Sequence, residues 1–141
     1  MTTLNPYINF KGNCREAMVF YQHCLGGQLN MQTVAGSDIE DQCPASMQDQ
    51  IIHATLLNGA IFIMASDMCG PGGYEEGNAI AISVNCVSET EINTCYSRFA
   101  EGGKILDPLK TQFWGGMFGV VLDKFGVRWM FNYNKNESQL K

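Results

Sequence analysis

The sequence predicts an α+β fold made of two tandem βαβββ modules, and three observations support this. An apolar strand, an amphipathic helix and a Gly-Gly stop occur twice, first in NPYINF and KGNCREAMVFYQHCLGG, then in NAIAISV and NCVSETEINTCYSRFAEGG. The equivalent stops at Gly26 and Gly102 lie 76 residues apart. After each stop, apolar segments predict three further strands, of which the last two form a hairpin. Such an internal repeat indicates a duplicated domain whose halves usually frame a shared cleft.

Each predicted helix has its own start, apolar face and stop. The first helix starts at the N-cap Asn13, with Glu16 three residues later, and the second starts at the capping box of Ser88 and Glu91. Apolar residues recur at helical spacing in both, as Ala17, Phe20, Tyr21, Cys24 and Leu25, and as Ile92, Cys95, Tyr96, Phe99 and Ala100. Gly26-Gly27 then ends the first helix with a left-handed C-cap, and Gly102-Gly103 ends the second.

Apolar segments predict strands at 5–10, 28–35, 51–57 and 60–65 in the first module, and at 79–86, 104–110, 116–122 and 127–133 in the second. Asn58-Gly59 is typical of a tight hairpin turn. The acidic segment 36–50 is predicted to be a mobile loop. We assign 1–141 to one domain, with module one at about 4–69, a linker at about 70–77, module two at about 78–134 and a solvated tail at 135–141.

Charge and hydropathy exclude several partners. The formal net charge is −5 and the nine basic residues are scattered, whereas non-specific nucleic-acid binding requires clustered Lys and Arg. No apolar segment has the length of a membrane span, and the N-terminus does not resemble a signal peptide. We therefore expect a cytoplasmic protein that binds neither nucleic acid nor membranes.

The six cysteines predict neither a zinc site nor a disulfide framework. No two form a C-x-x-C pair, and His23 and His53 are not clustered with them. Cys24 and Cys95 are expected to be small buried apolar residues. Cys43 and Cys69 lie in predicted loops, and the sequence leaves their redox role open. The other two cysteines are Cys14 and Cys86.

Three segments together resemble a known family: 5–27, then IIHATL-NG-AIFIMASD, then FWGGMFGVVLDKFGVRWMFN. They resemble the vicinal oxygen chelate superfamily, which includes glyoxalase I, extradiol dioxygenases and bleomycin-resistance proteins. The most similar branch is the PhnB-like group, often labelled "3-demethylubiquinone methyltransferase-like". The resemblance covers nearly the whole chain. It implies modules that form a curved mixed sheet around a central cleft, with the helices on the outer face, usually in a homodimer.

The resemblance also implies four positions at which the family holds a divalent metal. Here these positions carry Pro6, Met64, Ala79 and Met130, and the second could shift to Ala65 or Ser66. Met is a soft ligand, and neither Pro nor Ala can ligate a metal through its side chain. We therefore expect no metal and no cofactor. The chain also has no Gly-rich loop for S-adenosylmethionine, so a true methyltransferase is not expected.

Strand alternation predicts which side chains line the cleft. It places Ile8, Phe62, Met64, Ala81, Ser83, Arg128, Met130 and Asn132 on the concave face, with Trp129 and Phe131 under a helix. The predicted ligand-binding residues are Ile8, Phe62, Met64, Ser83, Trp114, Arg128 and Met130. Trp114 would stack on a flat ligand or fill a seam between modules or subunits. Arg128 would hold an anionic ligand group or pair with an acidic neighbour.

Ser66 and Asp67 are the candidates for catalysis. Asp67 would act as a general base or cap backbone amides at a turn. His53 is expected to be a core or edge residue. Two functions follow: a metal-free protein that binds a small aromatic or apolar molecule, or an enzyme of the lyase, isomerase or dioxygenase type with a non-standard site. A third interpretation is a dimer without a ligand of its own.

Overall fold

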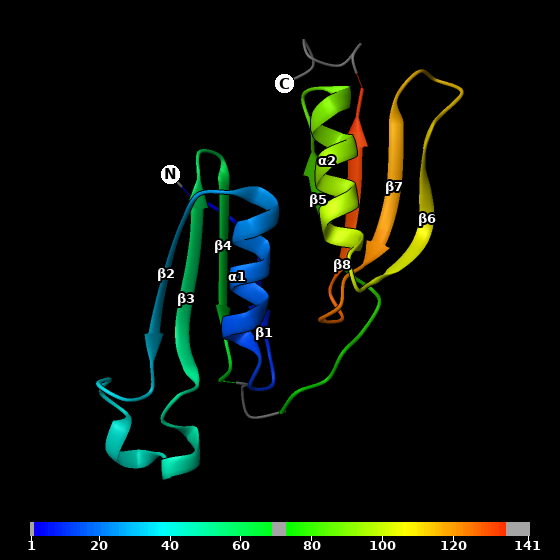
Figure 1. Cartoon of the computed structure of the whole chain (residues 1–141). Helices are drawn as coiled ribbons and strands as arrows, with labels where there is room; N and C mark the ends of the chain where they lie inside the picture. Colours follow the sequence, from blue (N-terminus) through cyan, green and yellow to red (C-terminus); the bar gives the residue numbers. More distant parts are fainter. Residues whose placement is uncertain (1, 69–72, 135–141) are drawn as a thin grey trace. The chain divides into compact units, whose positions relative to one another are not determined.

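The computed structural model describes residues 2–68 and 73–134, which form two compact units with a boundary between Glu75 and Glu76 (Figure 1). Each unit has one helix on one four-stranded mixed sheet, so the predicted pair of βαβββ modules is confirmed. We describe each unit by itself, and the shared cleft stays a prediction. Cys69, residues 70–72 of the predicted linker and the predicted tail lie outside the described residues.

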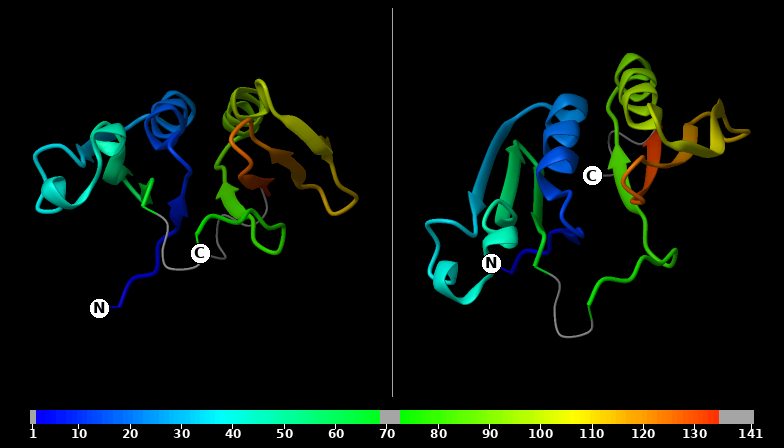
Figure 2. Two further views of the ribbon diagram at one scale, coloured as in Figure 1. Left: turned by 90° about the horizontal axis from the view of Figure 1, so that it is seen from below. Right: turned by 60° about the horizontal axis from the view of Figure 1, so that its bottom comes forward.

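The first unit contains β1 (Tyr7–Asn9), α1 (Cys14–Leu25), β2 (Gln28–Thr33), β3 (Ile51–Asn58) and β4 (Ile61–Ser66). The strand order is β1-β4-β3-β2, in which β1 runs parallel to β4 and the other pairs are antiparallel. The helix covers one face of this sheet (Figure 2). The core of the first unit includes the buried side chains of Phe10, Met18, Tyr21 and Leu56.

The acidic segment between β2 and β3 contains two short 3-10 helices, η1 (Glu40–Gln42) and η2 (Ala45–Met47). The side-chain amide of Gln48 connects them. It donates hydrogen bonds to the carbonyl oxygens of Glu40 at 3.0 Å and Cys43 at 3.1 Å. The predicted loop therefore has local structure that its composition does not reveal.

The second unit contains β5 (Ile82–Asn85), α2 (Glu89–Ala100), β6 (Lys104–Thr111), β7 (Met117–Leu122) and β8 (Arg128–Tyr133). The strand order β5-β8-β7-β6 repeats the order of the first unit. Under α2, the centroid of the Phe99 ring lies 4.5 Å from the centroid of Trp129 and 5.3 Å from that of Phe131. All three side chains are buried. Within the described residues, neither helix has the length and apolar character needed to cross a bilayer.

The two helices start in different ways. In α2, the Ser88 hydroxyl accepts a hydrogen bond from the Glu91 N–H at 3.0 Å, as the capping box predicts. In α1, Asn13 occupies the N-cap position, as predicted, but its side chain makes no capping bond. The cap comes instead from Asp67, whose Oδ1 accepts the N–H of Gly12 and of Cys14, each at 2.9 Å. An acceptor that directly follows β4, far away in the sequence, therefore replaces the local one.

The second glycine of each pair lets the helix end approach a hairpin. A Cβ on Gly103 would overlap the carbonyl oxygen of Leu122 and lie 3.0 Å from the Cα of Asp123. In the first unit, a Cβ on Gly27 would lie 2.5 Å from the carbonyl oxygen of Leu57. Both contacts are with backbone, which cannot move aside as a flexible side chain can.

We predict that Gly103→Ala lowers the free energy of unfolding by about 2 kcal/mol, because the added methyl group forces the helix end and the hairpin apart. Urea denaturation measures this change. Gly77→Ala is the matched control, because a Cβ there meets no heavy atom within 4 Å; its effect should stay below about 0.5 kcal/mol. Equal unfolding midpoints for the two variants would contradict the assigned role of Gly103.

Candidate functional site

Each sheet has one face packed on its helix and another that its helix leaves uncovered, which we call the open face. In the second unit, Met130 lies between Ser83 on β5 and Val120 on β7, and Arg128 lies beside Leu122. Trp129 and Phe131 point to the opposite face, under α2, as alternation predicted. The predicted binding residues Ser83, Arg128 and Met130 therefore share one open face, together with Asn132.

Arg128 is the charged residue of interest on this face. Its side chain is partly buried, and its Nε atom is buried without a hydrogen-bond partner. A buried donor that lacks a partner costs about 1–3 kcal/mol. Farther along the same face, the Ser83 hydroxyl donates to Asn85 Oδ1 at 3.1 Å. The predicted acidic partner of Arg128 is not observed among the described residues.

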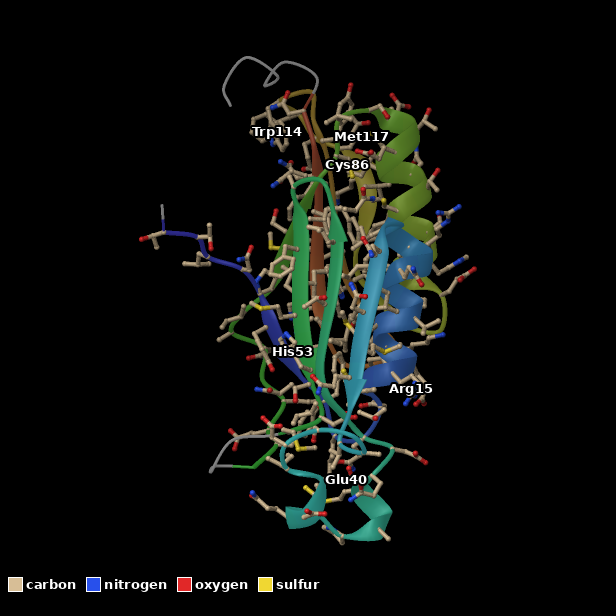
Figure 3. All side chains as sticks on the ribbon, turned by 90° about the vertical axis from the view of Figure 1, so that its left-hand side faces the viewer. Arg15, Glu40, His53, Cys86, Trp114 and Met117 are labelled. Carbon is tan, nitrogen blue, oxygen red and sulfur yellow. The ribbon has the colours of Figure 1, made fainter. Side chains whose placement is uncertain are left out.

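Trp114 lies at the other end of the same strands. It belongs to the turn between β6 and β7, and its ring occupies the space where a Cβ on Gly116 would point. Its side chain is 42% exposed and lies at the same end of the sheet as Met117 (Figure 3). Arg128 pairs with Leu122, at the opposite end of β7, about 17 Å away along the strand at about 3.4 Å per residue. One small ligand therefore does not contact both residues.

In the first unit, Phe62 and Met64 point to the open face, because they pair with Leu57 and Thr55, whereas Ile63 and Ala65 are buried. The placement of Ile8 beside them was wrong. Ile8 pairs with Ala65, so its side chain points to the helix-covered face. Tyr7 pairs with Met64 and takes the open-face position. Because side chains alternate along a strand, an error of one residue in register reverses the face of every residue in it.

The open face of the first unit also carries a pair that sequence reasoning missed. The hydroxyl of Tyr7 lies 3.5 Å from Nδ1 of His53, and the ring centroids are 6.0 Å apart. Both side chains are exposed, so His53 is not a core residue. The alternation of His53 with the buried Ala54 was a usable signal. In β1, by contrast, the sequence did not show which residues face the open side, because that strand has only three residues.

Ser66 and Asp67, the candidates for catalysis, are both held by backbone groups. The Ser66 hydroxyl donates to the Ile52 carbonyl oxygen at 2.9 Å and accepts the Met68 N–H at 2.8 Å. Beyond its two bonds to the start of α1, Asp67 accepts the Ile51 N–H at 2.9 Å through Oδ2. Asp67 is 7% exposed. Of the two interpretations of Asp67, the structure therefore shows the cap of backbone amides.

The positions where the family would hold a metal do not present suitable ligands. The carbonyl oxygen of Pro6 accepts the Met64 N–H at 3.1 Å, and Met64 and Met130 offer only thioether sulfur. Across residues 2–68 and 73–134, no three His, Cys, Asp or Glu side chains gather in a way that could hold a metal ion. These residues do not fit the divalent metal of the family.

Comparisons with known proteins agree with this architecture. The family model described as the glyoxalase/bleomycin resistance protein/dioxygenase superfamily matches residues 3–131. Protein YjdN of Escherichia coli strain K12 is 33% identical, over 95% of this chain and 97% of its own length.

Solved structures show the same similarity. Protein PA1353 from Pseudomonas aeruginosa is 38% identical with a TM-score of 0.81, and the match covers 95% of this chain and 98% of that one. The PhnB protein from Bacillus cereus is 26% identical with a TM-score of 0.70, covering 94% of this chain and 99% of that one.

We predict that Asp67→Asn lowers the free energy of unfolding by about 2–4 kcal/mol, because an amide NH₂ would face a backbone N–H that now has a carboxylate acceptor. Thermal and urea unfolding measure the loss. Asp38→Asn removes the same charge from an exposed loop position and serves as the control. An Asp67→Asn variant as stable as the control would contradict the structural role of Asp67 and would favour the alternative role as a general base.

Proposed function

Because the chain belongs to the glyoxalase/bleomycin resistance protein/dioxygenase superfamily, we propose that it binds a small organic molecule and that it does so without a metal. The ligand has an apolar or aromatic body and an anionic group. Its site is the open face of the second unit's sheet, at the end of β8 where Arg128 lies. The buried, unpartnered Nε of Arg128 is the observation that carries this proposal.

The chemistry of this face supports an amphipathic ligand. Leu122, Val120 and Met130 offer apolar surface to a hydrocarbon or ring, and Arg128 offers a planar fork of N–H donors. A carboxylate or sulfonate on the ligand would accept the hydrogen bond that Nε lacks within the chain. A charge-assisted bond of this kind contributes about 1.5–3 kcal/mol. Apolar contacts provide affinity and the anionic contact provides orientation.

An enzyme with a non-standard site is the second candidate, and the Tyr7–His53 pair is the observation that favours it. A phenol and an imidazole 3.5 Å apart on an open face are suited to proton transfer. The pair belongs to the first unit, and the chemistry it would serve is general acid–base catalysis. The expected symmetric homodimer is part of the proposal as well, on the basis of the family resemblance.

We predict that Arg128→Gln weakens binding of an anionic aromatic probe, 8-anilinonaphthalene-1-sulfonate, about tenfold or more. Binding of N-phenyl-1-naphthylamine, which has the same rings without the sulfonate, should change less than twofold. Fluorescence titration of both probes measures the two affinities. Lys124→Gln is the control for net charge, because Lys124 is exposed in the turn before β8. Equal losses for both probes, or an equal effect of Lys124→Gln, would contradict a specific anion contact at Arg128.

We predict that protein purified without a chelator or a metal-affinity tag contains less than one divalent ion per ten chains, because Pro6, Ala79 and Met130 offer no suitable ligand. Elemental analysis measures the content. The same protein should convert methylglyoxal–glutathione hemithioacetal far more slowly than the roughly 1 per second typical of enzymes. One tightly bound ion per chain would overturn the metal-free binding site, and rapid turnover would favour the enzyme.

A further inference from the structure

Two cysteines of the second unit meet between its sheet and its helix. Cys86 follows β5 directly, and its N–H donates to the Asn132 carbonyl oxygen at 2.8 Å, which extends the pairing of β5 with β8. Alternation from Ile82 and Val84 points its side chain toward α2. Its labelled position lies beside that helix (Figure 3).

Cys95 approaches from the helix. It lies on the face of α2 that turns toward the sheet, one turn after the buried Ile92 and one turn before the buried Phe99. The Cys86 and Cys95 thiols hydrogen-bond to each other. Cys86 is 8% exposed and Cys95 is half-buried, so solvent reaches the pair from the side of Cys95.

The first unit shows what packing alone places at these positions. Phe10 follows β1, and its N–H donates to the Ser66 carbonyl oxygen at 2.8 Å, as Cys86 does to Asn132. Phe20 is the seventh residue of α1, as Cys95 is of α2. The first unit therefore fills both positions with buried aromatic rings. The second unit uses two thiols in the same framework, which adds a chemistry that the core does not require.

We propose that Cys86 and Cys95 form a reversible dithiol–disulfide site that reacts with peroxides. Cys95 is the attacking thiol and Cys86 is the resolving thiol. The site lies on the helix-covered side of the second sheet, so it is separate from the open face and independent of the ligand proposed for that face.

The environment of each thiol matches its assigned role. The hydrogen bond from Cys86 lowers the pKa of Cys95 to about 7, although burial and the Glu91 charge raise it; the Arg98 charge makes a smaller contribution that lowers it. The same hydrogen bond, followed by burial, raises the pKa of Cys86. By contrast, burial raises the pKa of Cys14 to about 12. The attacking species is the thiolate, so Cys95 reacts first.

The reaction balances with a hydroperoxide as the oxidant. The Cys95 thiolate attacks the terminal peroxide oxygen, an S–O bond forms, the O–O bond breaks, and the departing alkoxide or hydroxide takes a proton. The Cys86 sulfur then attacks the Cys95 sulfenic acid, an S–S bond forms, and hydroxide leaves. The proton released by Cys86 converts that hydroxide to water. Glu91, whose carboxylate hydrogen-bonds the Cys86 thiol, can carry this proton. A reducing thiol reverses the oxidation by thiol–disulfide exchange.

The first experiment titrates the whole reduced chain with hydrogen peroxide and maps its peptides without reduction. We expect a loss of two hydrogen atoms per chain and an intramolecular link between Cys86 and Cys95, formed at about tenfold less peroxide than oxidation of Cys43, the half-buried loop cysteine. A thiol reductant should restore the starting mass. A link between any other pair, or Cys95 oxidation only at the dose that oxidises Cys43, would overturn the proposal.

The second experiment separates the hydrogen bond from the disulfide by two substitutions at one position. Cys86→Ser keeps a donor but removes the resolving sulfur, so Cys95 should still alkylate with a midpoint near pH 7, and its sulfenic acid should accumulate as a dimedone adduct. Cys86→Ala removes the donor, so the Cys95 thiol should titrate nearer the ordinary value of about 8.5 and alkylate about tenfold more slowly at pH 7.

Unfolding midpoints of both variants are compared with that of Cys43→Ser, so that a loss of folding is recognised. If either variant unfolds, the alkylation midpoint of Cys95 in the unsubstituted chain decides the matter. A midpoint above pH 8 would overturn the proposal, and one near pH 7 would support it. Equal midpoints in the Ser and Ala variants would also overturn it, because the Cys86 donor would then have no effect on Cys95.

Discussion

The carboxylate of Asp67 is the interaction on which the first unit depends. It accepts the N–H groups of Gly12 and Cys14 at the start of α1 and of Ile51 at the start of β3, so one buried group joins three segments. Without it, these amides would lose a charged acceptor in a buried place. The second unit contains a buried carboxylate at another point. Asp123 accepts the Phe125 and Val127 N–H groups of the β7–β8 hairpin and the indole N–H of Trp129, which links the turn to the core under α2.

Buried carboxylates and close-packed glycines hold each helix against one face of its sheet. That face therefore has a structural role. The helices leave the opposite faces uncovered, and the two units differ in the side chains that they carry there. The first open face carries the Tyr7–His53 pair, whereas the second carries Arg128 among apolar side chains. The two units therefore share a framework and differ on their open faces. The thiol pair is a divergence on the covered side, where the first unit has Phe10 and Phe20.

Sequence patterns predicted every strand and both α-helices to within a few residues, but not the 3-10 helices η1 and η2. Two side-chain assignments also failed, and both failed for the same reason. Asn13 has the side chain of an N-cap, yet Asp67, 54 residues later in the chain, supplies the acceptor at α1. Ile8 was assigned to the open face by counting along β1. In that three-residue strand, however, hydrogen bonding to β4 determines which side chains point to the open face. A local pattern cannot decide between a near and a distant partner when both have suitable chemistry.

By itself, the sequence determined the duplicated modules, the helix faces, the glycine stops, the hairpins and the family, because each depends on spacing within a short segment. Only the tertiary structure decided that Asp67 is a cap, that Trp114 and Arg128 lie at opposite ends of one sheet, and that Cys86 meets Cys95. These facts depend on the register between segments, which hydrogen bonds between separate strands and the packing of a helix on its sheet determine together. The sequence specifies the chemistry of each side chain, but the tertiary fold determines which side chains lie next to one another.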